Sequence, residues 1–387
     1  MSDKPERKLH FSIQEYQERL SKVRQEMARE GADVLLVVKP QNIFYLSGCR
    51  TYGGALAPDL LVVPSDGPMK HVTRAFEVGV LRTFSWVEDI RAYKDTEDPF
   101  LVLRDTVAET KAKKQRIGVE LNSAYFPALT LEKVRSIVPG AEFKDVSNLI
   151  GNIRLIKSEK EIQYVREAAR LADLGMRAGI NAVKEGVYEY EVMAEIFHAL
   201  FKNGQDDVST TVLVISGPNS GLAHCSHHDR KIGRGDPVLI EHGGCCHLYC
   251  SNVLRTVFVG EPSKRIRAMY EAAAKAHDLA IQAVRPGVRA EEIDMIAHRV
   301  VEDAGFGEFF VRRTGYALGI TAQPDHWIEP LNLLKGDSHV LQPGMVLSIE
   351  PGPSVFGEGG CSIGDNVLVT KEGYEYLTTP SKDMVIR

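Results

Sequence analysis

Two short stretches share a layout that could present carboxylates for chemistry. Gly235–Thr256 opens with an apolar run that ends at Glu241, and Gly344–Gly352 opens with an apolar run that ends at Glu350. In both stretches a turn signal follows the acid. A strand that carries a carboxylate to its end holds that group on a rigid sheet. The two glutamates are therefore candidates for acid–base catalysis, although a Glu that only caps a turn is the plainer alternative.

These two stretches belong to an internal repeat. Ala182–Val192 matches Ala283–Ile293 in sequence, and Gly186 and Gly287 lie about 101 residues apart. Each copy predicts two helices, a glycine and then strands. We therefore expect two αββ halves related by a pseudo-twofold axis, with both glutamates directed into one central cleft.

The region before the repeat predicts a smaller α/β domain. A helix is expected over Phe11–Gly31 and another near Leu129–Ser136. The expected strands cover Asp33–Val38, Phe44–Ser47, Leu60–Pro64 and Arg116–Glu120. Ser158 and Glu161 have capping-box spacing and open the next helix. We place the boundary just before that helix, which gives domains 1–152 and 153–387 and an α+β fold class.

Composition excludes several classes of partner. The 387 residues include 47 basic and 52 acidic side chains, a net charge of −5, which gives no electrostatic footprint for nucleic acid. No apolar run is long enough to span a membrane, and the polar N-terminus has no signal core. We expect a cytoplasmic protein whose six cysteines are reduced thiols.

Several sequence motifs support the same predicted architecture. The stretches IRLIKSEKEI, NSGLAH, RGDPVLIEHGG with YCSNVLRT, and PGMVLSIEPG with GDNVLVT all occur in order along the chain. From about Phe11 to Thr378 the sequence resembles the pita-bread family of creatinase, prolidase, aminopeptidase P and methionine aminopeptidase. The resemblance implies a duplicated αββ domain preceded by a smaller α/β domain.

The peptidases of that family bind two metal ions with two Asp, one His and two Glu. The matching positions in this sequence are Glu241, Asn252, Tyr316, Glu350 and Gly364. Only Glu350 keeps the family's residue. A dinuclear centre needs several anionic oxygens to offset two dications, and this set supplies about two. The expectation is therefore no metal and no cofactor.

The expected activity is therefore taken from the metal-free members of this family, ectoine hydrolase and creatinase. Arg313–Glu329 resembles a segment of ectoine hydrolase, interrupted at His326, and Leu254 stands where creatinase has its second catalytic Glu. The resemblance implies a metal-independent hydrolase of a non-peptide C–N bond in a small amidine-like zwitterion. Two alternatives stay open. One is a metallopeptidase like Xaa-Pro aminopeptidase, and the other is a non-catalytic binding protein with a degenerate metal site.

Four residues form the expected catalytic set. Glu241 would act as nucleophile or as base for water, and Glu350 would hold the amidinium nitrogens. His224, in NSGLAH, would pass a proton to the leaving nitrogen. Tyr316 would orient the substrate or stabilise the tetrahedral intermediate. Further expected contacts of a small-molecule substrate, in a homodimer, are Asn252, His228, Trp327, Arg50 and Tyr52.

A crowded segment raises the question of zinc. It contains His242, Cys245, Cys246, His247 and Cys250. Neighbouring residues of a strand point to opposite faces, so Cys245 and Cys246 do not face one ion unless a turn bends them together, and no CxxC pair is present. Small buried core residues are the favoured interpretation of these cysteines.

Overall fold

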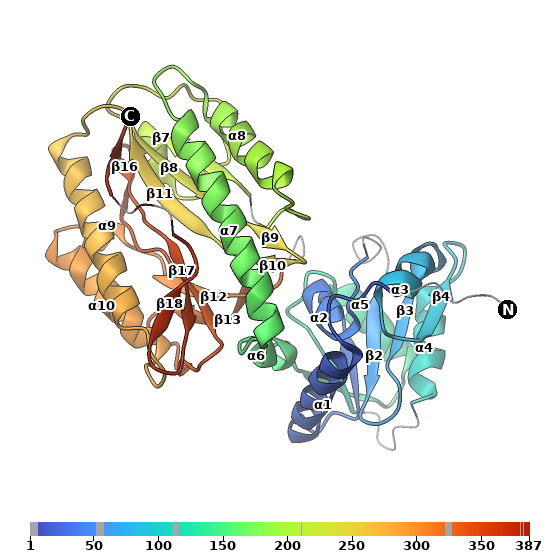
Figure 1. Cartoon of the computed structure of the whole chain (residues 1–387). Helices are drawn as coiled ribbons and strands as arrows, with labels where there is room; N and C mark the ends of the chain where they lie inside the picture. The colour runs from blue at the N-terminus through green and yellow to red at the C-terminus, as the bar shows by residue number, and fades with distance from the viewer. Residues whose placement is uncertain are drawn as a thin grey trace. The chain divides into compact units, whose positions relative to one another are not determined.

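The chain divides into two compact units, one ending at Ile153 and the other beginning at Arg154. Figure 1 shows the structure, a computed structural model. It describes residues 7–51, 58–110, 116–209, 211–321, 327–379, 381 and 383–387. Within these ranges no helix has the length and apolarity needed to cross a membrane.

The N-terminal unit is built on one six-stranded sheet, in the order β4-β3-β2-β1-β5-β6. The strands are β1 (Val34–Val37), β2 (Leu60–Pro64), β3 (Lys70–Arg74), β4 (Asp89–Tyr93), β5 (Arg116–Val119) and β6 (Glu142–Asp145). The helices are α1 (Ile13–Glu30), α2 (Pro40–Ser47), α3 (Val78–Phe84), α4 (Pro99–Ala108), α5 (Ala128–Ile137) and α6 (Leu149–Arg154), with a 3₁₀ turn at Ala75–Glu77.

Local signals explain α1. The side chain of Ser12 accepts a hydrogen bond from the backbone N–H of Glu15, and Gly31 ends the helix in the left-handed conformation. The buried face carries apolar residues at helical spacing, namely Tyr16, Leu20, Val23 and Met27. The helix predicted over Phe11–Gly31 is thus confirmed.

The strand predicted over Phe44–Ser47 is wrong, because this segment is the end of α2. All eight residues of α2 are buried, so the helical period leaves no polar face, and a short apolar run does not distinguish strand from helix. Features outside the apolar run explain why α2 is a helix. Pro40 occupies the first turn, and Glu120 accepts hydrogen bonds from the backbone N–H groups of Val38 and Lys39.

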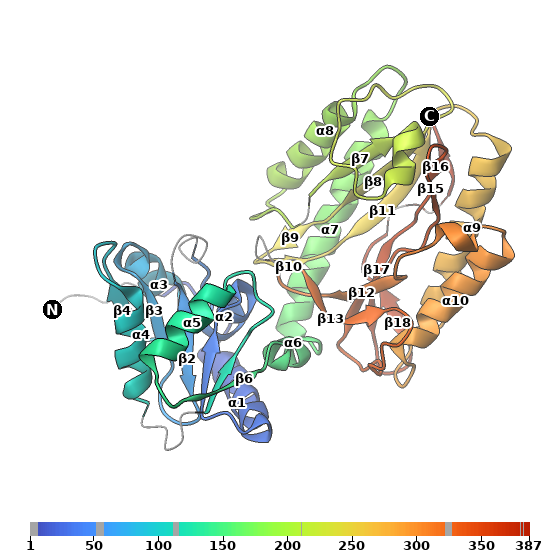
Figure 2. The same ribbon diagram turned by 180° about the vertical axis from the view of Figure 1, so that it is seen from behind.

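The C-terminal unit contains two larger sheets and two helix pairs. One sheet has the order β19-β11-β8-β7 and the other β13-β12-β14-β17-β18. The helices are α7 (Glu159–Ala182), α8 (Glu189–Lys202), α9 (Lys264–Gln282) and α10 (Ala290–Asp303), with 3₁₀ turns at Gly217–Leu222 and Gly307–Phe309. The strands of both sheets lie between the two helix pairs (Figures 1 and 2).

The strands of this unit divide between its two halves. The first half contains β7 (Leu213–Ser216), β8 (Pro237–His242), β9 (Cys245–Cys246), β10 (Tyr249–Cys250) and β11 (Val253–Phe258). The second contains β12 (Gly315–Leu318), β13 (Ile328–Leu333), β14 (Val346–Ile349), β15 (Ser354–Val355), β16 (Gly359–Gly360), β17 (Asp365–Val369) and β18 (Tyr374–Tyr376). The last strand, β19 (Val385–Ile386), pairs with β11.

The internal repeat is visible in the backbone. Gly186 follows α7 with φ of 84°, and Gly287 follows α9 with φ of 90°, a region that L side chains rarely adopt. Each helix pair is then followed by an antiparallel strand pair, β8–β11 in the first half and β14–β17 in the second. A single β-bridge between Leu254 and Gly364 joins the two sheets. The predicted duplicated αββ architecture is confirmed.

The helix α7 packs against the turn that follows β8. Ser158 and Glu161 form the expected capping box at its start. Further along, a Cβ atom on Gly244 would lie 2.0 Å from the carbonyl oxygen of Ala168 and 2.8 Å from the backbone nitrogen of Ala172. Only glycine permits this approach of the turn to the helix.

We therefore expect Gly244→Ala to lower the free energy of unfolding by about 3 kcal/mol, because backbone atoms of α7 have to move to admit the methyl group. Gly373→Ala is the matched control, since a Cβ atom there meets nothing within 4 Å. The control should stay within about 0.5 kcal/mol of the original protein. Urea denaturation of both variants measures the difference, and equal stability would contradict the packing described.

Candidate functional site

The two glutamates of the repeat meet at one amide. Glu241 lies near the end of β8, and Glu350 directly follows β14. Asn252 precedes β11, and its Nδ2 atom lies 3.3 Å from Oε1 of Glu241 and 3.1 Å from Oε2 of Glu350. The convergence expected from the pseudo-twofold repeat is thus present in the structure.

A phenol completes this cluster. Nδ2 of Asn252 lies 3.0 Å from the hydroxyl oxygen of Tyr316, and that hydroxyl donates to Oε2 of Glu350 at 3.2 Å. The indole N–H of Trp327 donates to the same hydroxyl oxygen at 3.4 Å. Burial, and then the charges of Glu350 and Glu241, hold the pKa of Tyr316 well above its ordinary value. Tyr316 therefore remains a protonated donor.

Glu350 also accepts hydrogen bonds from a cation that sequence reasoning missed. Nη1 of Arg312 lies 3.1 Å from Oε1 of Glu350, and Nη2 donates to the backbone oxygen of Glu350 at 2.7 Å and to Oγ of Ser362 at 3.0 Å. The signal available in the sequence was the Arg312-Arg313 pair ahead of Tyr316, in a segment otherwise short of charge. Arg312 supplies positive charge beside the two carboxylates.

The environment of Glu241 changes its protonation. Burial first, and the charge of Glu350 second, raise the pKa of Glu241 to about 7, while Arg312 and the hydrogen bond from Asn252 act in the opposite direction. Two close carboxylates in a poorly solvated site favour holding one proton between them. A carboxyl that titrates near neutral pH can both accept and donate a proton.

The backbone of Asn252 is fixed from behind the cluster. Its N–H donates to Oδ1 of Asn366 at 2.8 Å, and its carbonyl oxygen accepts from Nδ2 of Asn366 at 2.7 Å. Asn366 lies on β17 and both residues are fully buried. This reciprocal pair fixes the position of Asn252 between the glutamates.

The structure does not link the other expected site residues to this cluster by hydrogen bonds among the residues it describes. His224 is exposed and follows Ala223, whose φ of 52° is strained for a residue with a Cβ atom. A ring nitrogen of His228, Nδ1, lies 3.1 Å from the backbone oxygen of Val214. Among the residues described, no hydrogen bond joins either histidine to Glu241, Glu350 or Tyr316. Arg50 belongs to the N-terminal unit, and Tyr52 lies outside the described residues.

The residues at the family's five metal-binding positions do not fit two divalent ions. Nδ2 of Asn252 donates toward both glutamates, so this amide offers a cation only the neutral oxygen Oδ1, which is buried and has no hydrogen-bond partner among the described residues, where the family has an anionic carboxylate. Position 364 supplies no carboxylate, and it is crowded, because a Cβ atom there would lie 2.7 Å from Cδ1 of Leu254 and 3.0 Å from Cβ of Glu350. The described part of the chain contains no group of three or more His, Cys, Asp or Glu that could hold a metal ion.

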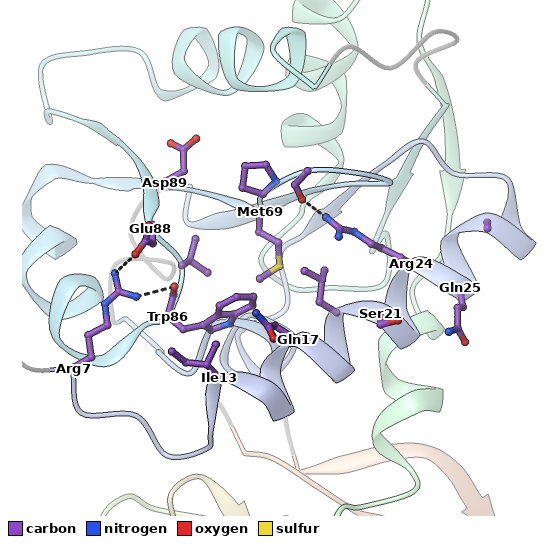
Figure 3. A pocket seen from close by; sticks show the side chains of 15 residues that line it. Arg7, Ile13, Gln17, Ser21, Arg24, Gln25, Met69, Trp86, Glu88 and Asp89 are labelled. Carbon is purple, nitrogen blue, oxygen red and sulfur yellow. Dashed lines mark hydrogen bonds and ion pairs between the residues drawn. The ribbon is translucent and has the colours of Figure 1, made fainter.

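A groove in the N-terminal unit is unrelated to this chemistry. It has a volume of about 1100 Å³ and lies along α1, beside the start of β4 (Figure 3). Its cations already have partners. Arg7 donates to the backbone oxygen of Trp86 at 3.0 Å and pairs with Glu88, and Arg24 donates to the backbone oxygen of Pro64 at 3.1 Å. Titratable groups do not converge there as they do around Asn252.

The raised pKa of Glu241 has a consequence for stability. The folded protein keeps this proton up to a pH of about 7, whereas an ordinary Glu releases it near 4.5. The stabilisation that this proton gives is fully present below the lower value and is lost as the pH rises through the upper one. Compared with Glu241→Gln, the original protein should lose stability across this window. Urea unfolding at several pH values measures the difference, and a constant difference would contradict the assignment.

Comparisons with known proteins place the chain among peptidases. Residues 163–371 match the model of metallopeptidase family M24, and residues 19–156 match the creatinase/prolidase N-terminal domain. A putative dipeptidase, YkvY of Bacillus subtilis, is 32% identical over 371 residues, which cover 95% of this chain and 99% of that protein.

Solved structures agree with this placement. A prolidase from Thermococcus sibiricus has a TM-score of 0.89 and 28% identity, covering 97% of this chain and 100% of its own. An Xaa-Pro dipeptidase from Bacillus anthracis has a TM-score of 0.86 and 26% identity, covering 96% of this chain and 100% of its own.

These relatives correct the expected activity. Hydrolysis of a non-peptide C–N bond in an amidine-like zwitterion, as by ectoine hydrolase or creatinase, is wrong as an expectation, because the relatives are described as dipeptidases and prolidases. That expectation depended on the substituted metal-binding positions and, among the metal-free relatives, on Arg313–Glu329 and Leu254, whereas the likeness to peptidases extends over nearly the whole chain. This chain belongs to metallopeptidase family M24, with a creatinase/prolidase N-terminal domain.

Proposed function

We propose that this protein hydrolyses the peptide bond of dipeptide-sized substrates at the Glu241–Glu350 pair, without the two divalent ions of its family. The observation that carries the proposal is the amide of Asn252 held between two glutamates, one of which titrates near neutral pH. The substrate class is supported by relatives that are described as dipeptidases and as Xaa-Pro dipeptidase.

The pair can supply the proton transfers that amide hydrolysis needs. In this proposal the carboxylate of Glu241 removes a proton from a water molecule, whose oxygen bonds to the substrate's carbonyl carbon. The protonated Glu241 then gives the proton to the leaving nitrogen as the C–N bond breaks. Glu350 holds Asn252 and Tyr316 in position, and the Tyr316 hydroxyl orients the substrate carbonyl.

Arg312 gives this arrangement a source of positive charge. A tetrahedral intermediate develops negative charge on oxygen, which metal ions stabilise in a dinuclear peptidase. In this pocket the guanidinium of Arg312 is the cation next to the pair, at 3.1 Å from Glu350. Its side chain is 33% exposed, so it borders the space that a substrate enters.

The remaining sequence-based assignments stay predictions. We propose that His224, His228 and Trp327 contact substrate, and that Arg50 and Tyr52 take part through the N-terminal unit. The expected homodimer and the cytoplasmic location also stay predictions.

A second function, binding without turnover, is favoured by one specific observation. Asn252 and Gly364 replace two of the carboxylates that bind metal in the family's peptidases, and Leu254 closes the space beside Gly364. A scaffold that only binds dipeptides would retain the pocket and lose hydrolysis. Measuring binding and product formation on the same dipeptide panel separates the two functions.

The absence of fitting metal ligands predicts an enzyme that is insensitive to chelation. Protein treated with a strong chelator and desalted should hydrolyse a panel of Xaa-Pro and other dipeptides at a rate within about twofold of untreated protein, because the pair provides the acid and base itself. Added Mn²⁺ should change little. Hydrolysis that appears only after metal is restored, with metal bound in stoichiometric amount, would show the proposal to be wrong.

Glu350→Gln should lower kcat about 100-fold or more, because the variant replaces the carboxylate that accepts hydrogen bonds from Asn252 and Tyr316 and so misplaces both side chains. Glu358→Gln is the control, since Glu358 forms an exposed ion pair with Arg265. The control should retain activity. Equal activity of both variants, measured by dipeptide hydrolysis, would remove Glu350 from the mechanism.

A further inference from the structure

The turn between the two site residues Glu241 and Asn252 carries a pair of facing thiols. Strands β9 and β10 form a short hairpin in which Cys245 is the direct cross-strand partner of Cys250. Residues that face each other across an antiparallel pair place their side chains on the same side of the ribbon. Both cysteines are fully buried, and neither forms a disulfide in the structure.

The backbone hydrogen bonds show which kind of cross-strand pair this is. The N–H of Cys245 donates to Oε1 of Gln205 at 3.1 Å, and the N–H of Cys250 donates to the backbone oxygen of Gly319 at 3.1 Å. Since both N–H groups point away from the hairpin, the two cysteines form its non-hydrogen-bonded pair. Such pairs have Cα atoms about 4.5 Å apart, which lies within the range that a disulfide spans.

The thiols already contact each other. A hydrogen bond between the two side chains, followed by burial, raises the pKa of Cys245 well above its ordinary value. The sulfur of Cys250 also donates to the backbone oxygen of Leu248 at 3.6 Å. No large movement of the strands is therefore needed to bring the two sulfur atoms into bonding distance.

The tip of the hairpin is strained. His247 has φ of 48° and Leu248 has φ of 66°, values that suit glycine or asparagine in a two-residue turn. The tip is held by outside contacts, from the N–H of His247 to Asp206 at 2.6 Å and from the N–H of Thr321 to the backbone oxygen of Leu248 at 2.8 Å. These contacts hold the tip in its strained conformation, so the hairpin opens only when they are transiently lost.

We propose that Cys245 and Cys250 form a reversible disulfide that locks the hairpin between Glu241 and Asn252. The oxidant is a low-molecular-weight disulfide such as oxidised glutathione. One cysteine thiolate attacks it, forming a mixed disulfide and releasing one glutathione thiol. The second cysteine thiolate then attacks the mixed disulfide and releases the other. The two cysteines lose two electrons and two protons, and the oxidant is reduced to two thiols.

Burial of the two sulfur atoms slows disulfide formation but does not decide whether the dithiol or the disulfide is favoured at equilibrium. The thiolate is the attacking species, and in the closed hairpin both sulfur atoms are buried, while the contact with Cys250 and burial raise the pKa of Cys245 well above its ordinary value. Oxidation therefore proceeds through opened hairpins and is slow. Once formed, the bond excludes opening, so the spacing between Glu241 and Asn252 is fixed more firmly. This inference does not depend on the proposed dipeptide hydrolysis.

The test uses the full-length protein in glutathione redox buffers, approached from the reduced and from the oxidised side until both agree. After acid quenching, remaining thiols are alkylated in denaturant, and intact mass and peptide maps are recorded. We expect a loss of two hydrogens per chain, two of the six cysteines protected, a peptide that links Cys245 to Cys250, and full reversal by dithiothreitol. Tm should rise by a few degrees on oxidation.

Matched variants separate this pair from the other thiols. Cys225→Ala and Cys246→Ala alter the two half-buried cysteines and should leave the linked peptide in place. Cys250→Ala should abolish it together with the rise in Tm. Glutathione adducts at Cys225 or Cys246 alone, or six alkylated cysteines after equilibration, would overturn the proposal. The map of the unmutated chain decides the question even where Cys250→Ala does not fold.

Discussion

Two carboxylates that face each other in a poorly solvated pocket repel, and the side-chain amide of Asn252 together with Arg312 offsets that repulsion. Asn252 can donate only two hydrogens to its three nearby acceptors, so the cluster also depends on the proton of Glu241 and on the Tyr316 hydroxyl. The strands β8, β11, β12 and β14 must therefore hold these groups to within about 0.5 Å of their required positions, which a duplicated sheet framework can do.

The support behind the cluster is polar and buried. Asn366 fixes the backbone of Asn252 in both directions, and the neighbouring Asp365 accepts from Arg255 at 2.9 Å. Burial alone would raise the pKa of Asp365, but His277 and Arg255 outweigh it and lower that pKa. Buried polar groups that satisfy one another resist displacement, because moving one leaves its partners without a hydrogen bond. This second layer keeps the site residues in place.

The sequence predicted the features that depend on pattern. The repeat predicted that Glu241 and Glu350 converge, because equivalent strands of two related halves end at the same place. It did not predict Arg312, since the direction of one arginine depends on tertiary packing, nor α2, whose apolar run has no exposed face. The expected activity was wrong because substitutions at the metal-binding positions, together with one short segment, were given more weight than likeness along the whole chain. The roles of His224 and Trp327 depend on loop conformation and on the substrate, and neither can be predicted from the spacing of residues in the sequence.

The contact between Gly364 and Leu254 limits how this pocket can change. A glutamate at position 364 requires the side chain of Leu254 to move, because its Cβ atom would lie 2.7 Å from Cδ1 of Leu254. Either change made alone is therefore harmful, since a smaller residue at 254 leaves a void and a larger one at 364 collides. A carboxylate at position 364 therefore calls for a compensating change at position 254, so the effects of substitutions at the two positions are expected to be non-additive.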